Sequence, residues 1–81
     1  MKVKTIIYSD VNTLTPEKLE ENKIFNENNF SIIRILQYDV YNNKNDWFNI
    51  LCKNIEKIIK EGIIQNIYMS HNNEYNVLQK L

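Results

Sequence analysis

The chain has 81 residues, ten of them basic and ten acidic, and its formal net charge at pH 7 is zero. This length fits one domain, and the balanced charge argues against a protein that holds nucleic acid by neutralising many phosphates. The single cysteine excludes an intramolecular disulfide, and no apolar run approaches the roughly 18–20 residues needed to span a bilayer. The N-terminus does not read as a signal peptide, so we expect a cytoplasmic protein without a membrane partner.

The first predicted elements are a strand and a helix. Residues 3–8 are rich in β-branched and aromatic side chains, which favour a strand. Thr15 then stands at an N-cap position, Pro16 fits the first helical position, and Glu17 suits the positive end of the helix dipole. The predicted helix extends to about residue 26.

The next predicted strand covers residues 30–41, "FSIIRILQYDVY". Its middle is apolar on both faces, a pattern typical of a strand covered on two sides. Arg34 interrupts one of these faces. Because arginine is rarely buried completely, we expect Arg34 at an edge or end position with its guanidinium in solvent.

The strongest helical pattern is "DWFNILCKNIEKIIKEG", preceded by Asn45 or Asp46 as the cap. Its apolar residues recur at helical spacing on one stripe, and lysines interleaved with glutamates occupy the other side, which predicts a solvated face. Cys52 lies on the apolar stripe and is expected to be a small core residue. Gly62 stands where a residue with positive φ ends a helix. The stripe comprises Trp47, Phe48, Leu51, Cys52, Ile55, Ile58 and Ile59.

A third strand is predicted over residues 63–69, followed by a helix capped by Asn72 or Asn73 with Tyr75, Leu78 and Leu81 on one side. The order β-α-β-α-β-α predicts an α/β fold with a small three-stranded parallel sheet. Helices between consecutive parallel strands also predict right-handed crossovers.

Polar residues follow each predicted strand, at the edge where α/β proteins bind ligands. Carboxylates with an imidazole could hold a metal or transfer protons, so an enzyme using Asp10, Asp39 and His71 is one hypothesis. The ordinary polarity of loops in α/β proteins explains the same pattern, and we favour that interpretation. The chain has no glycine-rich phosphate loop, HExxH or CxxC motif that would indicate a cofactor. The residues are Ser9, Asp10, Asn12, Asp39, Ser70 and His71.

Three ordered motifs resemble the catalytic domain of the serine recombinases, the resolvase/invertase family. The family's first strand ends in a pattern like Tyr-x-Arg-Val-Ser-Thr, and residues 8–13 of this chain read "YSDVNT". The family continues with a helix, an apolar strand ending in Asp, and a helix ending in an acidic residue and Gly before the next strand. This chain has "LEENKIFNENNFSIIRILQYD", "WFNILCKNIEKIIKEG" and "IIQNIYM" in that order. The resemblance implies that residues 1–81 form a single, truncated resolvase-like domain.

The chain departs from the family at the positions that carry its chemistry. The resemblance places Asn12 where the family has its nucleophilic Ser, and an amide cannot serve as an activated nucleophile. Asp10 replaces an Arg that would hold the scissile phosphate, and Asn45 replaces the Arg before the middle helix. After the third strand, "SHNNEYN" has no counterpart to the family's Asp-Arg-x-x-Arg. We therefore expect a protein that is not an enzyme and needs no cofactor.

A fold that keeps its shape but loses its chemistry predicts binding to other proteins. Our leading hypothesis is a regulatory protein that binds a serine recombinase and modulates DNA recombination, as a recombination directionality factor does. Self-association is a second use of the same exposed apolar surface. The alternative hypothesis is a phage or mobile-element protein that inhibits a host defence nuclease by binding it. The candidate partner-binding residues are Trp47, which could instead belong to the core, and Tyr75, Leu78 and Leu81.

Overall fold

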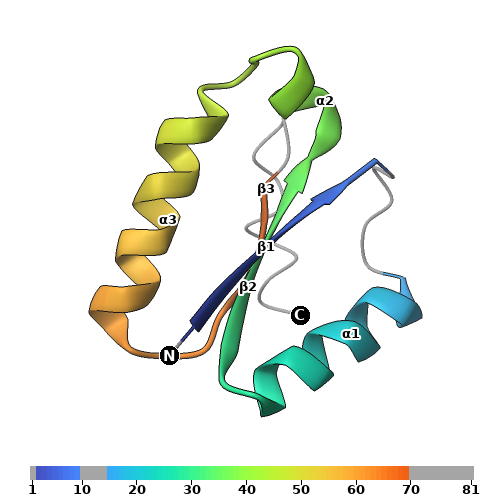
Figure 1. Ribbon diagram of the computed structural model, residues 1–81, viewed down its shortest axis with the longest axis vertical. Helices are drawn as coiled ribbons and strands as arrows, with labels where there is room; N and C mark the ends of the chain where they lie inside the picture. The colour runs from blue at the N-terminus through green and yellow to red at the C-terminus, as the bar shows by residue number, and fades with distance from the viewer. Residues whose placement is uncertain (1, 10–14, 70–81) are drawn as a thin grey trace.

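A computed structural model of the chain describes residues 2–9 and 15–69, which form a three-stranded parallel sheet with helices between the strands (Figure 1). This arrangement confirms the predicted α/β class with a parallel sheet. The predicted helix after Asn72 or Asn73 lies outside the described residues. The elements are β1 (Lys2–Tyr8), α1 (Pro16–Glu27), β2 (Phe30–Leu36), α2 (Gln37–Tyr41), α3 (Trp47–Glu61) and β3 (Asn66–Met69).

The strands lie in the order β1-β2-β3, so β2 is the central strand. In register, Thr5 pairs with Ile33, and Ile33 pairs with Ile67. Six consecutive residues of β2, Ser31–Leu36, are buried, as the prediction of a strand covered on both faces requires. The core of the molecule is therefore centred on β2.

The two longer helices cover opposite faces of the sheet (Figure 1). On one face, α3 packs Ile58 against Ile33 and Ile35. On the other face, α1 contacts Arg34 and Tyr68 through the side chain of Asn22. The β1–β2 connection contains α1, the β2–β3 connection contains α3, and both move one strand across the sheet in the same direction. Because α1 and α3 lie on opposite faces, the two crossovers have opposite handedness. Only one of them can be the right-handed crossover that the sequence predicts, and the expectation that both would be right-handed is wrong.

The predicted helix ends at Thr15 and Gly62 are confirmed. The Thr15 Oγ1 atom accepts a hydrogen bond from the Lys18 N–H at 3.2 Å, and Pro16 opens α1. Gly62 ends α3 with φ of 66°, and its N–H donates to the Ile58 carbonyl at 3.0 Å. Asp46, not Asn45, is the N-cap of α3, although its side chain accepts no hydrogen bond from the helix backbone.

Two predicted strand boundaries are wrong. Residues 37–41 form α2 and do not continue β2, and residues 63–65 precede β3. The pairing of the strands explains the first difference. β1 pairs with β2 only as far as Leu36 of β2, and β3 pairs with β2 only as far as Ile35 of β2. In the part of the chain that the structure describes, no neighbouring strand is paired with the backbone beyond Leu36, whereas a helix bonds its own N–H and C=O groups.

Candidate functional site

The carboxyl edge of the sheet is where the sequence predicts a site. Of the polar residues predicted there, the structure describes Ser9 and Asp39. Asp10, Asn12, Ser70 and His71 lie outside the described residues, so the combination of Asp10, Asp39 and His71 stays a prediction. Within residues 2–9 and 15–69, no group of three or more His, Cys, Asp or Glu side chains could hold a metal ion.

Asp39 and Asn45 hold the turn between α2 and α3 together. Asp39 is buried, and its Oδ1 atom accepts a hydrogen bond from the Asn45 Nδ2 atom at 3.0 Å. The Asp39 carbonyl also accepts from the Lys44 N–H at 2.9 Å. Asn43, Asn45 and Asp46 all have positive φ, a conformation that Asn and Asp tolerate better than most residues. Asn45, at the position where the resemblance expects an Arg, therefore has a structural role in shaping this turn.

Tyr8 connects the two outer strands across β2. Its hydroxyl donates a hydrogen bond to the Met69 carbonyl at 3.1 Å, and its ring lies 6.3 Å from the Tyr68 ring, centroid to centroid. Burial, with smaller contributions from the Asp39 carboxylate and Tyr68, raises the pKa of Tyr8 to about 12. The phenol is therefore protonated at neutral pH and acts as a structural hydrogen-bond donor, not as a base.

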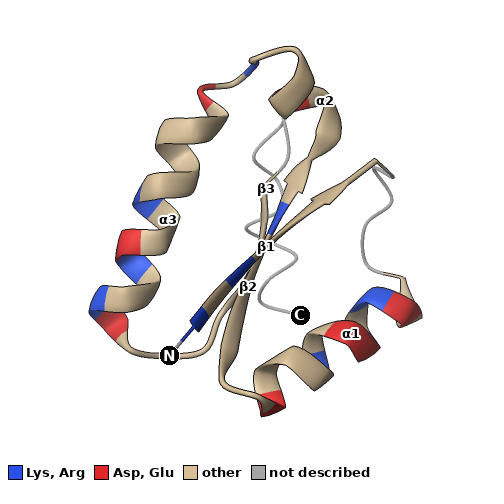
Figure 2. Ribbon diagram, in the orientation of Figure 1, with Lys and Arg blue, Asp and Glu red and all other residues tan. Residues whose placement is uncertain are grey.

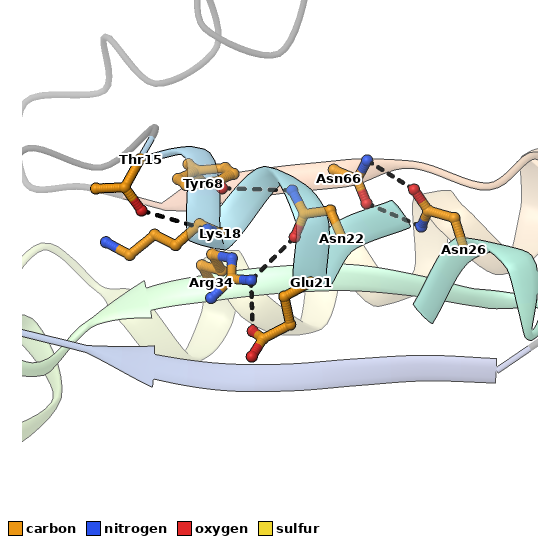
Figure 3. A network of polar contacts seen from close by, with 8 residues as sticks. All are labelled: Thr15, Lys18, Glu21, Asn22, Asn26, Arg34, Asn66 and Tyr68. Atoms are coloured by element: carbon orange, nitrogen blue, oxygen red, sulfur yellow. Dashed lines mark hydrogen bonds and ion pairs between the residues drawn. The ribbon is translucent and has the colours of Figure 1, made fainter. Parts of the chain in front are cut away.

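Arg34 lies beneath α1 and not at a solvent-exposed edge, so the predicted position of its guanidinium is wrong (Figure 3). Only 2% of its surface is exposed. The Nη2 atom donates to Glu21 Oε1 at 2.7 Å and to Asn22 Oδ1 at 3.0 Å. Asn22 Nδ2 in turn donates to the Tyr68 hydroxyl at 3.4 Å. These partners, all on α1 and β3, make burial of the charge tolerable.

A second polar contact joins α1 to the sheet through Asn26 and Asn66. Each amide donates to the oxygen of the other, at 3.0 and 3.1 Å (Figure 3). Asn26 also donates to the Phe30 carbonyl at 2.9 Å. The apolar Leu19 and Ile24 of the same helix are about half exposed. α1 is thus fixed to the sheet largely by polar side chains, which is why its sequence lacks a clear apolar stripe.

An open hollow of about 390 Å³ lies between β1 and the first turns of α1. Its charged lining is balanced, with Lys18 and Arg34 opposed by Glu17 and Glu21. The Lys18 ammonium lies 5.0 Å from the centroid of the Tyr8 ring. Neither this ammonium nor Arg34 Nε has a hydrogen-bond partner within residues 2–9 and 15–69. A lining of mixed sign does not select a cationic or an anionic ligand. The eight lining residues are Ile6, Ile7, Tyr8, Ser9, Glu17, Lys18, Glu21 and Arg34.

The charges on the outer face of α3 are also mixed (Figure 2). Lys53, Glu56, Lys57, Lys60 and Glu61 are all exposed, which confirms the predicted solvated face. Alternating signs along one helix do not form the basic stripe that phosphate backbones require.

The corner between α2 and α3 carries four aromatic residues within eleven positions, which we call the aromatic corner: Tyr38, Tyr41, Trp47 and Phe48. Trp47 is half-buried and packs against the core, so it is not a freely exposed anchor. Its ring contacts that of Phe48 edge to face at 5.5 Å. Phe48, predicted in the core stripe, is 60% exposed, and Tyr38 and Tyr41 are 56% and 71% exposed.

Sequence reasoning missed the exposure of this corner because Phe48 matches the helical stripe and Tyr38 matches a strand. Of the other candidate partner-binding residues, Tyr75, Leu78 and Leu81 lie outside the described residues. Cys52, expected in the core, is only partly buried.

The described helices are all too short or too polar to cross a membrane. Comparison with known proteins gave no match to a protein family, to a curated protein or to a solved structure.

Proposed function

We propose that this chain is a non-catalytic regulatory protein that binds another protein through its aromatic corner. The observation that supports this proposal is the exposure of Tyr38, Tyr41 and Phe48, each more than half exposed, around the half-buried Trp47. Aromatic side chains are enriched at the centres of protein interfaces because they bury a large area at a small cost in conformational entropy. Trp47 fixes the corner to the core, so the exposed rings are held on a supported surface.

The expected partner is a serine recombinase, whose assembly or direction the protein would regulate. This choice of partner rests on the three motifs that resemble the recombinase catalytic domain and on the replacement of its nucleophile and phosphate-binding arginines. The polar groups of Asn45 and Arg34, both used in internal hydrogen bonds, are consistent with a role in structure and not in catalysis.

The experiment is a binding measurement on the wild type and on a variant carrying both Tyr41→Ser and Phe48→Ser. The tagged protein is used to isolate partners from its native host, and the recombinase found there is purified for a titration. We expect the double variant to weaken binding at least about tenfold, as loss of interface anchors commonly does.

Ile24→Ser is the matched control, because Ile24 is 53% exposed on α1, away from the aromatic corner. Equal affinity of the wild type and the double variant would contradict the role of the corner. Isolation of a defence nuclease and no recombinase would instead support the alternative, in which the protein is an inhibitor.

A further inference from the structure

α1 contributes little apolar surface of its own to the core. Within α1, Asn22 is the residue that is buried, and its side chain is polar. Leu19 and Ile24 are about half exposed, so much of the apolar surface of α1 lies in solvent. By contrast, α3 packs the buried Ile58 and several partly buried apolar residues against the sheet. The two helices are therefore held on the sheet by different kinds of contact.

The contacts that hold α1 are largely hydrogen bonds to β2 and β3 (Figure 3). Asn22 accepts from Arg34 and donates to the Tyr68 hydroxyl. Asn26 and Asn66 exchange two further hydrogen bonds. When such contacts open, water replaces the lost partners, so each contact contributes little to the net free energy. Contacts of this kind allow a helix to leave a sheet at a low cost.

Opening of α1 also returns a buried charge to water. The Arg34 guanidinium is almost completely buried in the closed form, and burial of an ion carries a desolvation cost. The opposing cost is the exposure of Ile32 and Leu36, which are buried and share the face of β2 with Arg34, because alternate residues of a strand point to the same side. This apolar burial keeps the closed form predominant.

A short turn, Asn28 and Asn29, joins α1 to β2 and supplies a hinge. Asn29 has φ of 69°, and its carbonyl accepts from the Lys2 N–H at 3.0 Å, so the sheet side of the turn is fixed to β1. β1 and β2 pair with each other over their full lengths, and no residue of α1 takes part in this ladder. The sheet therefore does not need to change when α1 moves.

We propose that α1 is a hinged cover that opens as one unit while β1, β2, β3 and α3 stay folded. A detached helix of 12 residues is unstable in water, so α1 unfolds when it opens and its backbone amides exchange with solvent. The open form presents Arg34, Tyr8 and Tyr68, all of which the closed form buries. The hydrogen bonds of Asn22 and Asn26 are thus the latch of a conformational device.

Hydrogen exchange of the native full-length chain, followed residue by residue by NMR under conditions that report opening equilibria, tests the proposal. In the wild type we expect amides in the middle of α1 to share one protection factor, about tenfold or more below that of the β2 amides. Ile58→Val should accelerate exchange of the β2 amides about two- to tenfold, because it weakens packing that is lost only on complete unfolding. The same variant should leave exchange of the α1 amides unchanged, since the contacts of Ile58 persist in the open form.

Asn26→Ala is the matched control. The hydrogen bonds of Asn26 are lost both in the open form and in the unfolded chain, so this variant should accelerate the α1 and β2 amides by the same factor, about fivefold or more. Equal protection of α1 and β2 in the wild type would overturn the proposal, because α1 would then open only with the whole molecule. An Ile58→Val variant that accelerates the α1 amides as much as the β2 amides would overturn it as well.

Discussion

Arg34 lies in the central strand with a half-exposed Glu21 as its ion-pair partner. Removing one partner of such a pair is costly when it leaves the other charge buried without compensation. Here the two partners differ, because the guanidinium is buried and the carboxylate has access to solvent. The pair should therefore respond asymmetrically to substitution.

Glu21→Ala is expected to lower the free energy of unfolding by roughly 1–3 kcal/mol, less than for a fully buried pair. Arg34→Met is expected to cost less than Glu21→Ala, because it removes the buried charge itself and leaves Glu21 in solvent. Urea denaturation of both variants measures the two costs.

Glu20→Ala is the control for helix propensity, since Glu20 is an exposed residue at the adjacent position of α1. In a variant that carries both Glu21→Ala and Arg34→Met, the two costs in unfolding free energy should not add, because Glu21 and Arg34 are in contact. A larger cost for Arg34→Met than for Glu21→Ala would show that the lost packing and the loss of the donor to the buried Asn22 Oδ1 atom outweigh the removal of the buried charge.

The Tyr8 phenol makes the free energy of unfolding depend on pH in the alkaline range. Its pKa is 10.0 in an unfolded chain and about 12 in the folded protein. Above pH 10 the unfolded chain loses this proton while the folded protein keeps it, so the stabilisation is complete below pH 10 and is lost as the pH rises towards 12. Two pKa units correspond to roughly 2–3 kcal/mol.

Tyr8→Phe should remove the absorbance change near pH 12 that Tyr8 contributes to the ultraviolet titration of the folded protein. The same variant should show a shallower fall in unfolding free energy between pH 10 and 12. Tyr41→Phe, which replaces a tyrosine that is 71% exposed, is the matched control for the loss of one phenol. A Tyr8→Phe variant that keeps the whole wild-type absorbance change near pH 12 would contradict the burial of Tyr8.

At the scale of elements, the parts of the fold that could be predicted are those written in local sequence. The Thr15-Pro16 start of α1 and the Gly62 end of α3 depend on the conformational preferences of single residues, and both are confirmed. The central position of β2 follows from its apolar residues on both faces. These signals depend only on residues that are close in the sequence, not on contacts with distant parts of the chain.

The end of β2 could not be predicted, because it depends on the length of its neighbours. The pattern of residues 37–41 suits a strand, but the strands beside it are paired no further than Leu36. The burial of Arg34 is a similar case, since its partners Glu21 and Asn22 lie 13 and 12 residues away on another element. Local patterns do not record contacts of this kind.

The candidate site was predictable only in part, for the same reason. Sequence placed Asn45 before the middle helix, but its bond to Asp39 follows from left-handed conformations at Asn43, Asn45 and Asp46. Trp47 and Phe48 are adjacent in sequence, and the stripe assigned both to the core. Only the packing of α3 decides that Trp47 faces inwards and Phe48 outwards.

At the scale of the whole molecule, the two layers of helices contribute differently to stability. α1 is attached mostly by polar contacts to Arg34, Tyr68 and Asn66, whereas α3 supplies the apolar layer over the other face. Within α3, Ile58 is the one residue that is completely buried among those described. A small domain has a modest core, so a large share of its stability should depend on this face.

Ile58→Ala is therefore expected to lower the free energy of unfolding by roughly 2–5 kcal/mol, through lost burial and the cavity left between α3 and Ile33. For a chain of this length, with a total stability of roughly 4–12 kcal/mol, such a loss can leave much of the protein unfolded. Ile59→Ala is the matched control, because the adjacent Ile59 is 67% exposed and its truncation should cost less than about 0.5 kcal/mol. Urea denaturation followed by the fluorescence of Trp47, which packs against the same core, measures both. Equal costs for the two truncations would mean that α3 does not present Ile58 to the sheet, and the apolar layer would have to be assigned to another face of the helix.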